Sequence, residues 1–83
     1  MYGRAINFTL LAPSLWSVVE AVAQPIETGD MKRNLFKSSD NTGFIIEIFT
    51  SKEIAGFNLE VLKAMQSLKE QAMAKVSIQE GMG

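Results

Sequence analysis

The side chains best able to bind a charged ligand are most concentrated in the segment 31–37. Three of the eight cations of the chain fall within it, interleaved with an amide and an aromatic ring: Lys32, Arg33, Asn34, Phe36 and Lys37. Lysine and arginine bind phosphates, asparagine reads base edges, and an aromatic ring stacks on bases. The segment is therefore a candidate for nucleic-acid binding. The favoured alternative is an edge strand, whose lysines discourage pairing with another sheet.

Carboxylates are the other chemically active group. Glu27, Asp30 and Asp40 lie in or near predicted loops, where two of them could act as acid and base or bind a divalent cation. Their spacing matches no ligand loop, and the turn-forming segment 38–43 lacks the alternating acids and the terminal glutamate of a calcium loop. The chain has no histidine and no cysteine, which removes imidazole bases, thiolate nucleophiles and the usual zinc and haem ligands. We therefore expect no catalytic residue, no metal and no cofactor.

Apolar side chains exceed what one small core can bury. They make up 47% of the 83 residues, and a chain of this size buries only about 60% of the surface that it exposes when unfolded. We therefore expect a protein partner, either a second copy in a homo-oligomer or a larger protein. The candidate interface residues are a tryptophan, two residues of an apolar strand and four of the last helix: Trp16, Ile45, Phe49, Leu59, Leu62, Met65 and Met73. Core packing against a sheet is the alternative for the helix stripe.

The charge balance gives no general attraction to nucleic acid or to anionic lipid. The chain has nine acidic and eight basic residues, so the formal net charge is -1. Any charged partner must meet a local patch. The length indicates a single domain, residues 1–83.

The elements that position these side chains follow from the hydrophobic pattern. Segment 4–11 alternates as a half-buried strand, and helical spacing begins at Pro13 and ends near Pro25. Segment 31–37 is a weak strand, 38–43 a loop, and 44–49 a strand that is apolar on both faces except at Glu47. Residues 76–83 form a short strand or a frayed tail. The sequence thus predicts an α+β fold of order β-α-β-β-α, with an optional last strand and both helices on one face of a mixed or antiparallel sheet. That is a ferredoxin-like plan or a truncated relative.

The junction after Phe49 carries two helix-start signals. Thr50 as N-cap places Glu53 at the third helical position, the spacing of a capping box, and it places Phe49 and Ile54 at the ends of a hydrophobic staple. We therefore expect one long helix from Thr50 to about Val76. Gly56 and Asn58 weaken its first turns, so a start at Asn58 stays open.

The N-terminal segment weakly imitates a secretory signal, but Asn7, Pro13 and Glu20 interrupt its apolar run. The run is also too short and too polar to span a membrane. We expect a cytoplasmic protein.

Taken together, these patterns predict a non-enzymatic protein-interaction module, an adaptor or inhibitor of the size that phages and other mobile elements encode. The alternative is a small nucleic-acid-binding or regulatory protein that uses the segment 31–37. An enzyme ranks third, because the usual catalytic residue types are absent.

Overall fold

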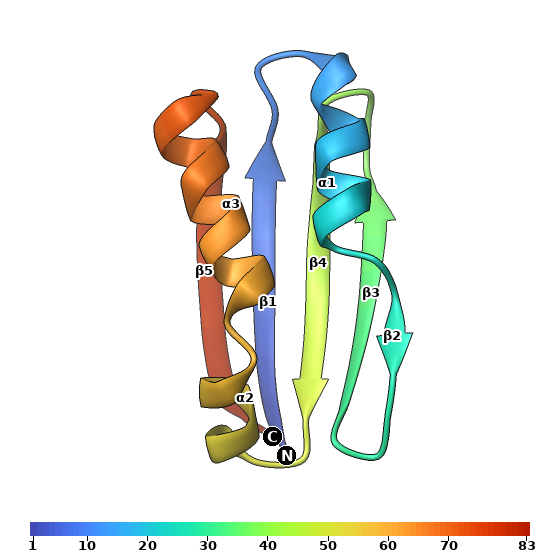
Figure 1. Ribbon diagram of the computed structural model, residues 1–83, viewed down its shortest axis with the longest axis vertical. Helices are drawn as coiled ribbons and strands as arrows, with labels where there is room; N and C mark the ends of the chain where they lie inside the picture. Colours follow the sequence, from blue (N-terminus) through green and yellow to red (C-terminus); the bar gives the residue numbers. More distant parts are fainter.

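The computed structural model describes residues 1–83, and its centre is a five-stranded antiparallel sheet of strand order β2-β3-β4-β1-β5 (Figure 1). The strands are β1 (Tyr2–Thr9), β2 (Ile26–Glu27), β3 (Met31–Lys37), β4 (Thr42–Phe49) and β5 (Lys75–Met82). β1 lies between β4 and β5 and pairs with both over its whole length. The first strand of the chain is therefore an interior strand of the sheet, and the last one forms an edge.

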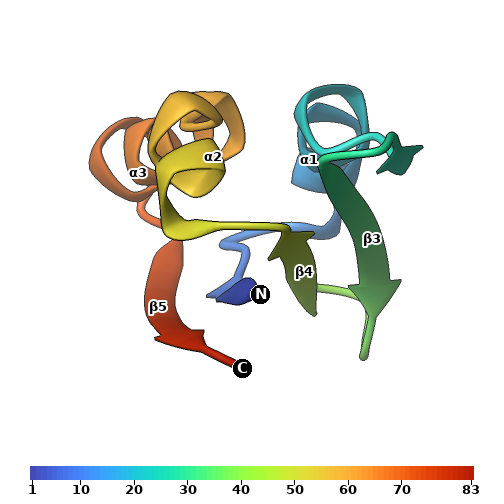
Figure 2. The same cartoon turned by 90° about the horizontal axis from the view of Figure 1, so that it is seen from below.

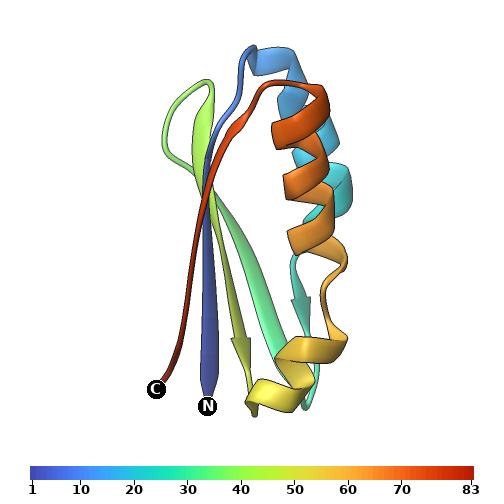
Figure 3. The same ribbon diagram turned by 90° about the vertical axis from the view of Figure 1, so that its left-hand side faces the viewer.

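All helices cover one face of this sheet. A 3-10 turn, η1 (Pro13–Leu15), leads into α1 (Trp16–Val22), and α2 (Lys52–Phe57) is followed by α3 (Glu60–Gln71). Figures 2 and 3 show α1 on one side and α2 with α3 on the other, all on the same face. Each helical connection crosses over between two parallel strands of the sheet, β1 to β3 and β4 to β5. Such crossovers are nearly always right-handed, which places both connections on the same face of the sheet. The opposite face, here named the open face, carries no covering element.

The predicted fold class is confirmed. The structure has the expected order with helices on one face only, except that the two-residue strand β2 was not expected, and the optional last strand forms in full as β5. β5 is longer than expected because it pairs with β1 from Tyr2 to Thr9, although its own sequence alternates only briefly. Long-range pairing therefore decides the structure of this segment.

Strict alternation assigns the strand residues to the two faces. On β1, Arg4, Ile6 and Phe8 are buried beneath the helices, while Asn7 between them is exposed. The core consists of two clusters. The larger cluster contains Ile6, Phe8, Leu10, Trp16, Val19, Ala23, Ile45, Val61, Met65 and Ala74. The smaller cluster contains Met31, Phe49 and Ala55.

The single long helix expected after Phe49 is wrong in two respects, whereas the alternative start left open at Asn58 lies close to the observed start of α3 at Glu60. Ser51, not Thr50, is the N-cap, and its hydroxyl accepts the N–H of Ile54 over 3.2 Å. The helix also stops at Phe57, where the guanidinium of Arg4 donates to the carbonyls of Ala55 and Asn58 over 3.1 and 2.8 Å, and the amide of Asn58 donates to the carbonyl of Ile54 over 2.8 Å. A side chain from β1 thus caps the end of α2, and α3 begins afresh at Glu60.

No helix of the structure has the length and apolar character needed to cross a membrane. The two chain ends lie side by side at one end of the sheet (Figure 1), where the N–H of Gly83 donates to the carbonyl of Met1 over 2.9 Å.

Candidate functional site

A row of alternating charges crosses the helix-covered face of the sheet. It consists of Arg33 on β3, Glu47 on β4, Arg4 on β1 and Glu80 on β5, and each neighbouring pair is in direct register. Glu47 accepts from Arg33 Nε over 2.8 Å and from Arg4 Nη1 over 3.1 Å, and Arg4 Nε donates to Glu80 over 2.9 Å. Glu47 is 0% exposed, and Arg4 and Arg33 are 3% and 6% exposed. We name these four residues the charge row.

The charges of the row are compensated within the fold. Besides its two carboxylate partners, Arg4 donates to Ala55 and Asn58, and Arg33 Nη2 donates to Glu60 over 3.2 Å. No buried side-chain nitrogen or oxygen lacks a hydrogen-bond partner. Buried charges are tolerated only when they are paired in this way. The guanidinium groups are therefore engaged by the protein and are not free to hold a ligand.

The charge row separates the two core clusters. Along β1 it lies between Tyr2 and Ile6, and along β4 it lies between Ile45 and Phe49. A register shift by one residue would turn every charge of a strand to the opposite face. The row therefore specifies strand register, which is a structural role.

A small cavity of about 230 Å³ lies beside the row, lined by Tyr2, Arg4, Lys52 and Glu80 among others. It is smaller than the roughly 300 Å³ at which ligand pockets usually begin. Its guanidinium is already paired with Glu80. These two facts make it a weak candidate for a ligand site.

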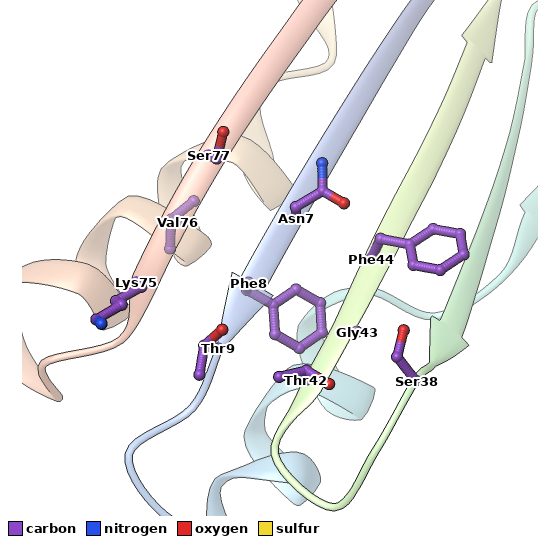
Figure 4. A pocket seen from close by; sticks show the side chains of 10 residues that line it. All are labelled: Asn7, Phe8, Thr9, Ser38, Thr42, Gly43, Phe44, Lys75, Val76 and Ser77. Atoms are coloured by element: carbon purple, nitrogen blue, oxygen red, sulfur yellow. The ribbon is translucent and has the colours of Figure 1, made fainter.

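The larger candidate is a hollow of about 330 Å³ on the open face, near the ends of β1, β4 and β5 that meet the loop 38–41. Figure 4 shows it from the open side. β1 contributes Asn7 and Thr9, between polar residues of β5 and residues of β4. Its open-face side chains are Asn7, Thr9, Thr42, Phe44, Lys75 and Ser77. We name it the open-face hollow.

The lining of the open-face hollow is rich in hydrogen-bond donors and has no carboxylate. Thr42 shares a hydrogen bond with the hydroxyl of Ser39 over 2.5 Å, which ties the loop to the rim. Amide, hydroxyl and ammonium groups of this kind stabilise negative charge on a bound molecule. No group of three acidic side chains that could hold a metal occurs in the structure.

The basic segment 31–37 is divided between the two faces of the sheet. Arg33 is buried in the charge row, and the ammonium of Lys37 lies 5.2 Å from the ring centre of Trp16 on the helix side. Lys32, Asn34 and Phe36 alternate with them and lie on the open face. Lys32 forms an exposed ion pair with Glu27 over 3.7 Å. Nucleic-acid binding through this segment stays a prediction, and only three of its five residues share a surface.

The seven predicted interface residues are likewise divided. Four are buried within the single chain: Trp16, Ile45, Phe49 and Met65. The other three are at least partly accessible, and Met73, which has a φ of 58°, is 73% exposed. Leu59 and Leu62 lie along the cavity beside Arg4. An interface at these residues stays a prediction, and the buried four serve the core.

Trp16 and the predicted loop carboxylates have structural contacts. Trp16 Nε1 donates to the carbonyl of Asp40 over 2.6 Å, so the loop is fastened to α1. The carbonyl of Asp30 accepts from the N–H of Thr50 over 3.0 Å. Both contacts use the backbone of the acidic residue and leave its carboxylate in solvent.

Sequence reasoning did not find either the charge row or the hollow. Glu47 was a signal for the row, because it is the one charged residue in an otherwise apolar strand. A buried acid requires cationic partners, and Arg4 and Arg33 occupy inward positions of their strands. The hollow had no such signal, since its polar residues look like ordinary solvent-facing strand positions.

Several solved structures share the fold. SnoaB, a cofactor-independent oxygenase from Streptomyces nogalater, superimposes with a TM-score of 0.67 at 17% identity, over 99% of this chain and 91% of its own. A protein from Deinococcus radiodurans, provisionally named an antibiotic biosynthesis monooxygenase, gives 0.64 at 15% identity over 100% and 92%. The designed protein Foldit4 gives 0.66 at 10% identity over 99% and 97%. No protein-family model and no characterised protein matches the sequence.

At these identities the likeness shows the fold. It also overturns the predictions that the chain is a non-enzymatic protein-interaction module and that it is not an enzyme. Those predictions relied on the lack of common catalytic residue types. One natural protein of this fold is an oxygenase that works without a cofactor, so the lack of metal ligands and thiolates does not argue against enzymatic activity.

Proposed function

We propose that this chain is an enzyme of the cofactor-independent oxygenase kind. The observation that supports the proposal is the whole-chain likeness to SnoaB and to the Deinococcus radiodurans protein. The open-face hollow is the proposed substrate site, because it is the larger of the two candidates and its donors are not committed to a buried ion pair.

Oxygenation without a cofactor limits the substrate. Its electrons must come from the substrate itself, and an activated methylene group next to a carbonyl can supply them. Loss of a proton gives a carbanion, which forms a C–O bond with dioxygen and regains a proton to give a hydroperoxide. Loss of water then breaks the O–O bond and leaves a ketone. One methylene and one dioxygen thus become one carbonyl and one water.

The lining of the open-face hollow restricts what the protein contributes to this chemistry. It has no histidine, cysteine or carboxylate to act as general base. The substrate must therefore be acidic enough to lose its proton to solvent. The amide of Asn7, the hydroxyls of Thr9 and Ser77 and the ammonium of Lys75 then stabilise the anion electrostatically.

The experiment measures oxygen uptake by the purified chain with indanedione, a flat diketone that has one acidic methylene between its carbonyls. We expect uptake above the spontaneous rate, with one dioxygen consumed for each methylene group that is oxidised. The derivative with both methylene hydrogens replaced by methyl groups is the unreactive control. We expect Asn7→Leu, which removes a donor and fills space, to lower the rate about tenfold or more. Uptake equal to that of heat-denatured protein, or unchanged uptake in this variant, would contradict the proposal.

For the partner, we propose a homo-oligomer formed through the half of the open face away from the hollow. An uncovered face of an antiparallel sheet normally presents polar residues, yet β4 presents Ile46 and Ile48 there, with Gly3 and Ala5 beside them on β1. Ile48 is 37% exposed.

A further inference from the structure

We propose that the open face carries a binding site for a neutral carbohydrate chain, built on Phe36 and Phe44 at the edge of the sheet. The site adjoins the open-face hollow but is distinct from it. Phe36 does not line the hollow, and the ring of Phe44 is turned toward β3 in Figure 4. The inference therefore goes beyond the proposed oxygenation and does not depend on it. Three features support it, namely an exposed aromatic pair, a surround of uncharged hydrogen-bonding groups, and an open sheet edge.

An exposed pair of aromatic rings is unusual on this face, because the uncovered side of an antiparallel sheet normally presents polar residues. Phe36 and Phe44 are direct partners in the β3–β4 pair, and their rings stack with centres 4.9 Å apart at an angle of 19° between the planes. Phe36 is 44% exposed. We name these two rings the aromatic pad. The face of an aromatic ring carries partial negative charge, so it attracts the weakly positive C–H groups on the flat side of a sugar ring.

Uncharged side chains surround the aromatic pad. On the open face, Asn34 and Ser38 lie two residues before and after Phe36, and Asn7 on β1 is the partner of Phe44. None of the side chains of Asn7, Asn34 and Ser38 forms a hydrogen bond within the chain. An amide donates and accepts at the same time, so one asparagine can bind two neighbouring hydroxyls of a sugar. The pad and its surround thus match both the apolar face and the hydroxyl rim of a carbohydrate.

The charges near the pad favour this ligand over a single-stranded nucleic acid, which would also stack on exposed rings. A nucleic acid needs cations for its phosphates. On the open face, Lys32 is already paired with Glu27, and Lys75 lies on β5 at the opposite edge of the sheet. Lys37 lies over the ring of Trp16 on the helix side. No cation of the segment is therefore left free beside the pad.

The sheet edge next to the pad is open. β2 pairs only with the first half of β3, so β3 is an edge strand from Asn34 onward. An extended ligand can therefore cross Phe36 and continue past the edge without meeting another element. The loop 38–41 borders the pad, and its one charged side chain is the acid Asp40. A carboxylate accepts hydrogen bonds from hydroxyl groups and repels phosphates, so the loop also favours a sugar chain.

The test uses cellotetraose, a linear chain of four glucose units in which every axial ring position carries hydrogen apart from the reducing end. NMR titration gives its affinity, and the shifted resonances give the location. We expect saturable binding, the same affinity at low and high salt, and the largest shifts at residues 34–38 and 42–44. A single-stranded thymidine tetranucleotide is the comparison ligand, whose binding would fall with salt. We expect it to bind more weakly than cellotetraose at every salt concentration.

Four variants make the test specific. Phe36→Leu keeps an apolar side chain but removes the flat ring, and we expect it to weaken cellotetraose binding about two- to tenfold. Phe57→Leu, which changes an 84% exposed ring on the helix side, is the matched control and is expected to have no effect. Asn34→Leu removes an amide and is expected to weaken binding about two- to tenfold. Lys32→Gln is expected to leave cellotetraose binding unchanged.

Because a cross-strand aromatic pair also stabilises a sheet, the folded spectrum of each variant is checked first. If Phe36→Leu does not fold, Asn34→Leu decides the test, since this change leaves both rings in place. Four outcomes would overturn the inference. They are no saturable binding of cellotetraose, unchanged affinity in both Phe36→Leu and Asn34→Leu, an equal loss in Phe57→Leu, and tighter binding of the tetranucleotide, which would assign the pad to nucleic acid instead.

Discussion

At the scale of single residues, Glu47 controls the interior more than any other polar side chain. One of its carboxylate oxygens accepts a hydrogen bond from Arg4, and the other accepts one from Arg33. Removing one partner of a buried ion pair costs more than the pair itself contributes, because it leaves an uncompensated charge in a medium of low polarity. Here two cations depend on the same acid.

We therefore expect Glu47→Gln to lower the free energy of unfolding by about 3–5 kcal/mol. Urea denaturation followed by circular dichroism measures this change. Glu60→Gln is the matched control, since Glu60 also pairs with Arg33 but its side chain is 62% exposed. We expect the control to change stability by less than about 1 kcal/mol. If the two variants lowered the free energy of unfolding equally, the burial of the charge row would not explain its contribution to stability.

At the scale of elements, the junction between β4 and α2 shows how a backbone contact sets a helix start. Thr50 and Ser51 are both good N-cap residues, and the sequence favoured Thr50 because of the glutamate three residues later. In the structure the backbone N–H of Thr50 donates to the carbonyl of Asp30, which extends the contact between the β2–β3 turn and the end of β4. The helix can begin only after that contact, at Lys52.

This arrangement predicts different effects for two similar substitutions. Ser51→Ala is expected to destabilise the protein by about 1 kcal/mol, the usual value of an N-cap hydroxyl. Thr50→Ala is expected to have little effect, because the Thr50 side chain is exposed and only its backbone is used. Thermal denaturation of both variants compares them. A larger loss in Thr50→Ala would mean that the capping box forms in solution.

At the scale of the whole molecule, the two faces of the sheet differ in what covers them. Helices bury the inner face, while the open face carries an apolar half around Ile46 and Ile48 and a polar half that contains the open-face hollow. Association through the apolar half leaves the hollow at the rim of the interface. The proposed oligomer and the proposed ligand site are therefore compatible.

We expect light scattering of the purified chain to show a homo-oligomer, and Ile48→Lys to convert it to a monomer because the substitution places a charge in the interface core. Phe57→Lys is the control, since Phe57 is an exposed apolar residue of α2 on the helix side. A monomer in the unmodified chain would contradict the proposal. Dissociation by Phe57→Lys alone would place the interface on the helices instead.

Part of this fold could be predicted because the responsible signals are local. Alternation identified the strand in segment 4–11, the weak strand expected at 31–37 has the observed bounds, and Pro13 marked the entry to the first helical segment. The break at Asn58 could not be predicted with the same certainty. The amide of Asn58 caps α2 locally by donating to the carbonyl of Ile54, but the other capping groups belong to Arg4, 54 residues earlier in the chain.

The site residues show the same limit. The sequence placed Lys32, Arg33 and Lys37 in one basic patch, but alternation sends Lys32 to the open face and the other two to the helix side. Which face of a strand is covered depends on the path of the helices, which local periodicity does not state.

The amino-acid sequence by itself determined the order of the elements, the apolar faces and the class of fold, because propensities and periodicities act between near neighbours. Only the tertiary structure decided that Arg33, Glu47, Arg4 and Glu80 form one row and that Asn7, Phe44 and Ser77 surround one hollow. These groups come from strands far apart in the chain, and their alignment depends on the register of three strand pairs. Register is a property of the assembled sheet, since pairing energies across all strands fix it together.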